Sequence, residues 1–161
     1  MITIKESGMT FGPFPEEQVY QIEKAEAYTR LGESVKAVEF VYRQNNDKLF
    51  FIEAKSSSPK PPGEQFSTYI DDISEKFIHS FNLWLTLNLN RRKDNVSKEV
   101  LDVSTDTQIF RFILVVHGHE ETWLPPLKAA LERKMLPEIK IWKHEVIVLN
   151  DRLAKARGLI K

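Results

Sequence analysis

The spacing of apolar residues along the chain predicts an alternation of strands and helices. Val35–Arg43 and Lys48–Lys55 are rich in β-branched and aromatic residues and flank the polar stretch QNND, a pattern typical of a β-hairpin. Ile109–His117 is almost continuously apolar, which predicts a strand buried on both faces. From Glu64 to about Asn90, a stripe of apolar residues at steps of three and four predicts a long helix with one face in the core: Phe66, Ile70, Ile73, Phe77, Phe81 and Trp84.

Weaker signals predict the remaining elements. Pro15 followed by two acids favours a helix that runs to about Arg30. Asn150 is a suitable N-cap for a last helix, Asn150–Gly158. We also expect, in chain order, a short edge strand at residues 2–5, a loop from Gly8 to Pro13, loops at 56–63 and 90–108, a helix around Pro125–Met135, and a strand or strand pair around Ile139–Leu149. This order predicts an α/β fold in a single domain, with a mixed central sheet flanked by helices on both faces.

Composition limits the partners and the chemistry that the chain can use. Its 161 residues fit one domain, and 42% hydrophobic with 29% charged residues is typical of a folded, soluble protein. The 23 basic and 23 acidic residues cancel, so binding of nucleic acid would need a local patch rather than a global field. The absence of cysteine excludes disulfides, thiol chemistry and cysteine-based zinc sites.

The sequence has no feature that predicts secretion or insertion into a membrane. The first residues, MITIKESG, lack a charged region followed by an apolar one, so we expect no signal peptide. The longest purely aliphatic or aromatic run after them, Phe112–Val116, is far shorter than the ~20 residues of a membrane helix. We therefore expect a cytoplasmic protein without a membrane partner.

The predicted hairpin brings two acids face to face. If Asn45–Asp47 is a three-residue loop, Gln44 lies opposite Lys48, and counting back places Glu39 opposite Glu53. Directly opposed residues share a face of the sheet, with Cβ atoms ~5 Å apart. Lys55 is two residues beyond Glu53 and shares that face. A slip of one residue would separate the two acids, because it moves every side chain of one strand to the other face.

Two facing carboxylates and a nearby ammonium are the groups that a phosphodiester-cleaving metal site requires. Mg²⁺ or Mn²⁺ takes carboxylate oxygens and leaves its other positions to water and phosphate. A lysine can hold the phosphate, orient the attacking water or stabilise developing negative charge. Glu23 and Glu26 lie near the apolar stripe of the expected first helix, where an acid either needs a partner or ligand or reaches solvent at the edge.

The segment VKAVEFVYRQNNDKLFFIEAKSS resembles the PD-(D/E)xK nuclease superfamily, which has the restriction-endonuclease-like fold. In that pattern an acid on one strand is followed by acid-x-Lys on the next, after an N-terminal helix that often supplies another acid. A helix and a further strand complete the core, and residues 64–117 can form both. On this resemblance, Glu39 matches the first acid, Glu53 the second, Lys55 the lysine and Glu23 the helix acid.

The sequence departs from the family pattern in several respects. Val38 precedes the first acid in place of proline, and this acid is Glu rather than Asp. Only two strands are expected between the first two helices, where the family core has three, and residues 2–5 are a candidate for the third. Glu-x-Lys also occurs at Glu132–Lys134 and Glu138–Lys140, but only Glu53–Lys55 ends an apolar strand whose hairpin partner carries an acid.

The resemblance implies a metal-dependent nuclease. Glu39 and Glu53, with Glu23, would hold Mg²⁺ or Mn²⁺, and Lys55 would position water or stabilise charge. The partner would be a nucleic acid, and DNA is favoured over RNA. A homodimer would bring two sites together and so allow both strands of a duplex to be cut. The zero net charge and the missing Pro-Asp favour an alternative, a catalytically inactive module of the same fold that binds nucleic acid or protein.

Two further motifs have simpler interpretations. His117 and His119 in HGHEET could ligate a transition metal, but no third histidine lies at a supporting distance, which favours a turn at Gly118 with solvated side chains. The basic run Arg91–Lys93 could follow phosphates, whereas its polar surroundings favour a solvated loop.

Overall fold

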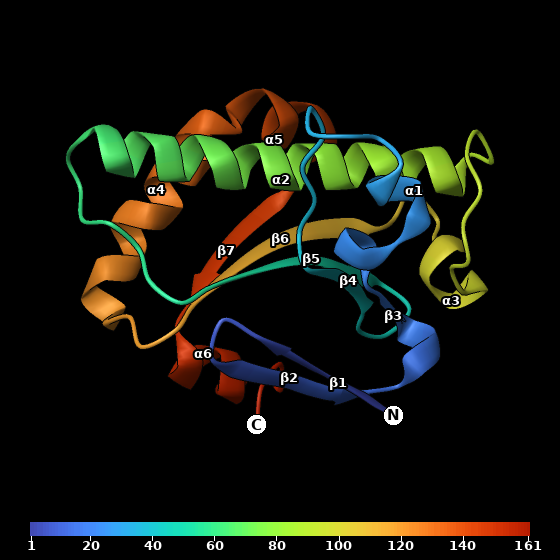
Figure 1. The fold of residues 1–161 in the computed structure, drawn as a ribbon, viewed down its shortest axis with the longest axis horizontal. Helices are drawn as coiled ribbons and strands as arrows, with labels where there is room; N and C mark the ends of the chain where they lie inside the picture. The colour runs from blue at the N-terminus through green and yellow to red at the C-terminus, as the bar shows by residue number, and fades with distance from the viewer.

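A mixed five-stranded sheet forms the centre of the protein in the computed structural model, which describes residues 1–161 (Figure 1). Its strands lie in chain order, with the first three antiparallel and the last three parallel: β3 (Val19–Tyr20), β4 (Phe40–Arg43), β5 (Lys48–Lys55), β6 (Ile109–Val116) and β7 (Glu145–Leu149). A separate antiparallel pair, β1 (Ile2–Glu6) and β2 (Met9–Phe14), packs below this sheet. The predicted α/β fold with a mixed sheet is confirmed.

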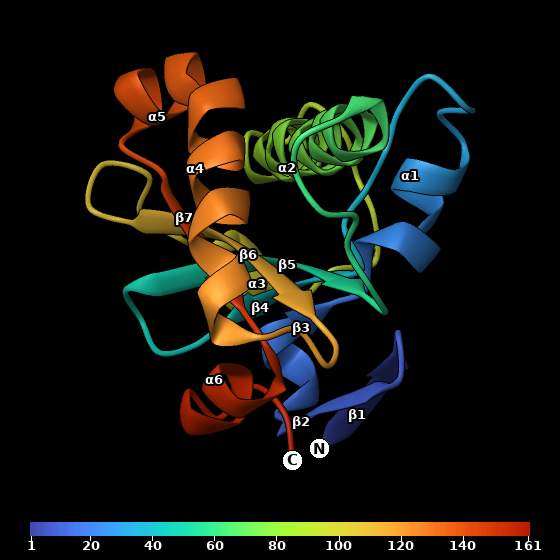
Figure 2. The ribbon, with the colours of Figure 1, turned by 90° about the vertical axis from the view of Figure 1, so that its left-hand side faces the viewer.

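Both faces of the sheet are covered, but by different kinds of element (Figures 1 and 2). Helices α2 (Glu64–Asn88), α4 (Leu124–Lys134) and α5 (Leu136–Trp142) lie on one side. The β1–β2 pair and helix α6 (Asp151–Ala156) lie on the other. The core is divided accordingly into a cluster of 27 buried residues under α2 and one of 15 on the opposite face.

Helix α2 has the boundaries and the buried face that its apolar spacing predicts. Ile70, Ile73, Phe77, Phe81 and Trp84 are all buried, and the Phe77 ring stacks on Phe112 of β6 at 5.1 Å. Each such side chain contributes roughly 1.5–3 kcal/mol by leaving water. The helix is therefore held in one position across the sheet, and so are the polar residues on the face that packs against the sheet.

The β4–β5 hairpin has the predicted register. The paired residues run from Phe40 opposite Ile52 to Arg43 opposite Leu49, and the Gln44 N–H donates to the Lys48 carbonyl at 2.9 Å. Asn45 adopts a positive φ of 68°, which asparagine tolerates in tight turns. Extending this register by one residue places Glu39 across from Glu53, although Glu39 lies in a bend just before β4 and outside the hydrogen-bonded ladder.

The predicted helix from Pro15 to Arg30 is wrong. Short 3-10 turns at Glu16–Gln18 and Ile22–Lys24, strand β3 and the four-residue helix α1 (Glu26–Thr29) take its place. Val19 and Tyr20 pair with β4, because β-branched and aromatic side chains fit the sheet better than an isolated helix. Strand β3, and not residues 2–5, is therefore the third strand before α2.

The first residues form a hairpin rather than an edge strand and a loop. Residues 2–5 belong to β1, which pairs with β2, and β2 includes most of the Gly8–Pro13 segment that was expected to be a loop. Phe11 and Phe14 are buried, and the Phe14 ring stacks on Tyr42 at 4.1 Å, so burial outweighs the turn signals. Gly12 has a φ of +93°, and a Cβ there would lie 2.8 Å from the Ile2 carbonyl oxygen.

The C-terminal third differs from the prediction in one segment. Of the strand or strand pair expected around Ile139–Leu149, the second half forms the single strand β7, and the first half belongs to helix α5. Pro137 suits the first turn of α5, and Lys143, at a φ of 59°, ends it. Within residues 90–108 a four-residue helix α3 (Lys98–Leu101) interrupts the loop. No helix combines the length and apolarity that crossing a membrane requires.

The last helix and its cap are confirmed. The Asn150 side chain accepts a hydrogen bond from the Leu153 N–H at 3.0 Å at the start of α6.

Candidate functional site

Glu53 and Lys55 stand near the carboxyl end of β5, on the sheet face that α2 covers. Glu53 is completely buried, although it is one of the last residues of its strand. It pairs with Leu114 of β6, and both neighbours of Glu53 on this face, Phe51 and Lys55, point toward α2. A buried carboxylate is costly unless it has partners, so its contacts define the site.

Two lysines hold one oxygen of Glu53. Its Oε1 accepts from Lys76 Nζ of α2 at 2.8 Å and lies 3.2 Å from Lys55 Nζ. The other oxygen, Oε2, is buried without a hydrogen-bond partner. Burial raises the pKa of Glu53, and the two ammonium groups offset this only in part. For Lys76, burial lowers the pKa, but the attraction of Glu53, Glu39 and Glu23 outweighs it and leaves the pKa raised.

Glu39 meets Glu23 beside this ion pair. Burial, a hydrogen bond with Glu23 and repulsion from Glu53 raise the pKa of Glu39 to about 9. At neutral pH Glu39 is therefore protonated and donates to the Glu23 carboxylate. Glu6 of β1 adds to the repulsion. The carboxyl groups outnumber the nearby ammonium groups of Lys55 and Lys76, and a proton on Glu39 relieves the excess negative charge.

The four residues predicted from the sequence are thus neighbours in space. Glu39 and Glu53 meet through the hairpin register, and Lys55 follows from strand alternation. Glu23 lies beside Glu39, as the resemblance implies, but it is carried by a 3-10 turn and not by the expected helix.

Sequence reasoning missed Lys76, which is as close to Glu53 as Lys55. Lys76 lies three residues after Ile73 and next to Phe77, so it belongs to the buried face of α2. Its side chain is only 16% exposed. A lysine inside an apolar stripe needs a counter-ion, and that was the available signal.

The donor set suits a hard cation held by few protein ligands. No group of three or more His, Asp or Glu side chains lies in a geometry that would hold a metal ion. The unpartnered Oε2 of Glu53 and the Glu39 carboxyl, once deprotonated, could supply two carboxylate ligands, which is the usual number for Mg²⁺. The remaining positions of such an ion belong to water and substrate oxygens.

An open hollow of about 1010 Å³ borders the site. Its lining includes Ser57–Pro59 from the loop after Lys55, together with Tyr69 and Asp72 from α2. Lys55 Nζ lies 3.9 Å from Asp72 Oδ2, and this contact connects the hollow to the Glu53 ion pair. The charged residues that line this hollow are mostly acidic, namely Glu64, Asp71, Asp72 and Glu75. Lys36 is the one basic residue among them, and its Nζ is paired with Asp72 at 3.0 Å and with Glu75 at 2.8 Å.

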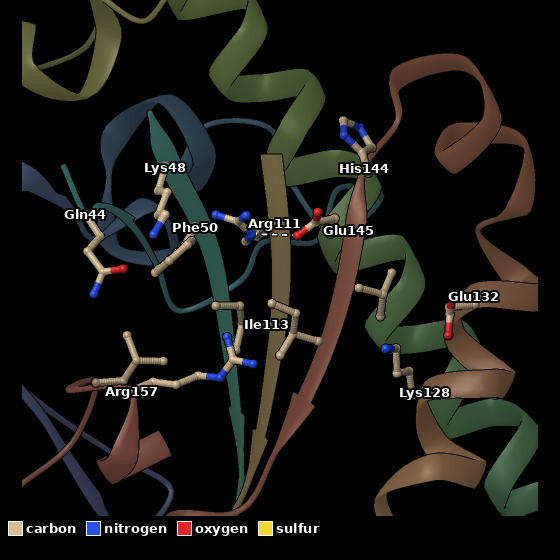
Figure 3. Close-up of a pocket in the computed structure, with 13 residues that line it drawn as sticks. Gln44, Lys48, Phe50, Arg111, Ile113, Lys128, Glu132, His144, Glu145 and Arg157 are labelled. Carbon is tan, nitrogen blue, oxygen red and sulfur yellow. Dashed lines mark hydrogen bonds and ion pairs between the residues drawn. The ribbon is translucent and has the colours of Figure 1, made fainter. Parts of the chain in front are cut away.

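A second cavity of about 590 Å³ lies nearer the amino ends of β5, β6 and β7 (Figure 3). Phe50 and Ile113 contribute to its wall, and the Arg111 guanidinium is ion-paired with Glu145 at 2.6 Å between the Nε and Oε2 atoms. None of the acids of the candidate site lines this cavity.

The remaining sequence motifs form structural contacts. Gly118 makes the predicted turn, at a φ of +64°, and His117, Glu120 and Glu121 beside it are exposed, as expected. His117 Nδ1 lies 2.7 Å from Asp151, and the His119 ring packs edge-on against Trp123 at 5.1 Å. Arg92 donates to the Ala27 carbonyl at 3.1 Å and so helps to hold the loop after α2.

No protein-family model, curated protein or solved structure matches this chain. The functional interpretation therefore depends on the residues and their geometry.

The shared proton at Glu39 predicts a pH-dependent stability in the absence of metal. Between the ordinary glutamate pKa of 4.5 and about 9, the folded protein holds a proton at Glu39 that the unfolded chain does not. The free energy of unfolding should therefore fall as pH rises through this range, by at most about 1.4 kcal/mol per pH unit. Urea unfolding in EDTA should show a smaller slope for Glu39→Gln, which keeps the hydrogen bond but cannot titrate.

The matched control is Glu26→Gln, since Glu26 is an exposed acid in the same region and pairs only with Arg30. It should retain the wild-type slope. An unchanged slope in Glu39→Gln would show that Glu39 is ionised in the folded protein and would contradict this account.

The buried ion pair predicts a large cost for removing Lys76. Lys76→Met keeps an apolar stem but leaves Glu53 with Lys55 alone, which should cost about 3 kcal/mol in urea unfolding. Adding Glu53→Gln should recover much of this loss, because the uncompensated charge is removed. Lys134→Met, which breaks an exposed pair with Asp71, should have almost no effect. Equal effects for the two lysines would argue against a buried pair.

Proposed function

We propose that the protein is a metal-dependent enzyme that hydrolyses nucleic-acid phosphodiester bonds on a restriction-endonuclease-like fold. The observation that carries this proposal is that Glu39, just before β4, and Glu53, on β5, are close enough to repel each other, with Glu23 and Lys55 beside them. Carboxylates arranged in this way repel each other, and the protein tolerates the arrangement at the expense of a proton on Glu39. A divalent cation would relieve the same repulsion without the proton.

Mg²⁺ or Mn²⁺ would be held by Glu39 and Glu53, with Glu23 as a further ligand, directly or through water. Such an ion lowers the pKa of a bound water and polarises the phosphate. Glu53 is held by its two lysines through Oε1, which leaves Oε2 without a hydrogen-bond partner and available as a ligand once an ion reaches it. Glu39 must lose its proton, so binding should compete with protonation.

The two lysines have different positions and, we propose, different roles. The Lys55 side chain is 28% exposed and lies between Glu53 and Asp72, at the border of the open hollow. It can reach a phosphate there and stabilise the negative charge that develops during hydrolysis. Lys76 is more buried and contacts Glu53 from α2, so it orients the carboxylate and is a positioning residue.

The order of the elements supports the fold assignment. Three antiparallel strands, β3 to β5, precede α2, and β6 then pairs parallel to β5. The first acid stands just before β4, and acid-x-Lys ends β5, as in the family pattern. Strand β3 supplies the third strand, whereas Val38 still stands in place of proline.

We propose a partner and a cellular setting to match this reaction. The substrate would be a nucleic acid, with DNA favoured over RNA, and the protein would act in the cytoplasm. One site of this kind cuts one strand, so cleavage of both strands would use a homodimer.

A second candidate function has an observation in its favour. Glu53 is fully buried and already neutralised by two lysines, and no three-ligand metal group is present. A module that has lost catalysis and binds nucleic acid or protein would also keep such a pair, as a structural contact.

Thermal unfolding with divalent cations separates these two functions. Several millimolar Mg²⁺ or Mn²⁺ should raise the melting temperature of the wild type, because the ion binds only the folded site. The shift should largely disappear in Glu53→Gln, which removes a ligand, and should persist in Glu121→Gln, an acid of the exposed turn after β6. If the wild type shows no shift, the inactive module is the better account.

A cleavage assay tests the reaction itself. On a panel of DNA and RNA with Mn²⁺, Glu53→Ala and Lys55→Ala should each lose at least about 100-fold in rate, since they remove a ligand and a charge-stabilising group. Lys134→Ala changes the lysine of another Glu-x-Lys triplet, which lies outside the site, and should keep full activity. Full activity in Lys55→Ala would overturn the assignment.

A further inference from the structure

Three side chains gather on a small hollow beside the loop that follows Lys55. We infer that Lys60, His119 and Trp123 form a stacking subsite for an unpaired nucleobase, so that the substrate is a single strand or an unpaired end. This inference rests on the proposed function and adds to it the class of nucleic acid that the site accepts.

The Trp123 ring is the centre of the group. Lys60 Nζ stands over it, 4.9 Å from the ring centroid, and the His119 ring packs against it edge-on at 5.1 Å. The backbone at Trp123 is fixed, because its backbone N–H donates to the Glu120 carbonyl at 3.0 Å and the chain continues directly into α4. Trp123 nevertheless remains 38% exposed.

The hollow is small, and three of its lining residues are prolines. Its volume is about 240 Å³, below the range of about 300–1,000 Å³ for drug-sized ligands. Pro59, Pro61 and Pro126 line it, and the buried Leu127 closes it. Proline lacks the backbone freedom of other residues, so little ordering would be needed when a flat group enters.

An exposed indole with a cation over it is the arrangement that binds single-stranded nucleic acids. Every base has a flat face that can stack on an aromatic ring, and this contact contributes about 1–3 kcal/mol per base. Lys60 can move from the ring to a backbone phosphate. Inside a duplex both faces of a base are covered by its neighbours, so an unpaired base can stack on Trp123 whereas a base within a helix cannot.

The subsite is continuous with the proposed catalytic site. Lys60 follows Lys55 by five residues, which limits their separation to about 18 Å. Pro59 lines both this hollow and the larger one that contains Asp72, and Asp72 lies 3.9 Å from Lys55. A strand with one base on Trp123 would therefore pass along the loop toward Glu53.

Binding without cleavage tests the inference. We would measure fluorescence polarisation of a labelled oligothymidylate of about twelve residues and of a hairpin duplex, in EDTA, so that no hydrolysis occurs. Trp123→Ala should weaken binding of the single strand about 5- to 150-fold, which corresponds to the stacking of one base. Trp123→Phe should keep most of the affinity. Binding to the duplex should change less than about twofold in either variant.

Trp142→Ala is the matched control, because Trp142 is 40% exposed but lies on α5, outside this hollow. It should bind the single strand as the wild type does. Equal losses in Trp123→Ala and Trp142→Ala, an equal loss on the duplex, or no binding of the single strand by the wild type would each overturn the subsite.

The outcome is separable from that of the cleavage assay. Binding that depends on Trp123 without any cleavage in Mn²⁺ would leave the subsite standing and reject the nuclease. Cleavage of single strands that is equally fast in Trp123→Ala and the wild type would support the nuclease and reject the subsite.

Discussion

The burial of Glu53 beneath α2 is the constraint on which the candidate site depends. A carboxylate with no exposed surface has to be neutralised, and Lys55 and Lys76 do this from the strand and from the helix. Their contacts fix the helix relative to β5 at this position. Burial, a hydrogen bond with Glu23 and repulsion from Glu53 together leave a proton on Glu39. Packing of the helix, orientation of the carboxylate and protonation of its neighbour are thus one connected arrangement.

The parts of the site that could be predicted are those fixed by local geometry. The hairpin register needed only the length of the turn at Asn45, and α2 needed only its apolar spacing. The first segment could not be predicted in this way, because Tyr20 forms its contacts with partners far along the chain, including a hydrogen bond to Asp94 at 2.7 Å. Lys76 was missed for the same reason. Its role depends on how α2 lies across β5, and a stripe of apolar residues does not specify this.

The functional proposals use two properties that coexist at the same end of the sheet. One is the group of carboxylates, Glu23, Glu39 and Glu53, that would bind a divalent cation. The other is an exposed ring, Trp123, on the far side of the loop that leaves β5. Because the chain has no net charge, affinity for nucleic acid would come from these local features rather than from long-range attraction. The same reasoning explains why stacking, which is insensitive to overall charge, suits this protein.

The most direct test of the central claim is the proton balance of metal binding. Calorimetric titration of Mn²⁺ near neutral pH, repeated in buffers of different ionisation enthalpy, measures the number of protons released. We predict that the wild type binds one ion and releases close to one proton, and that Glu39→Gln binds more weakly and releases none. Binding without proton release in the wild type, or no binding, would contradict the view that the Glu39 proton stands in for a metal ion.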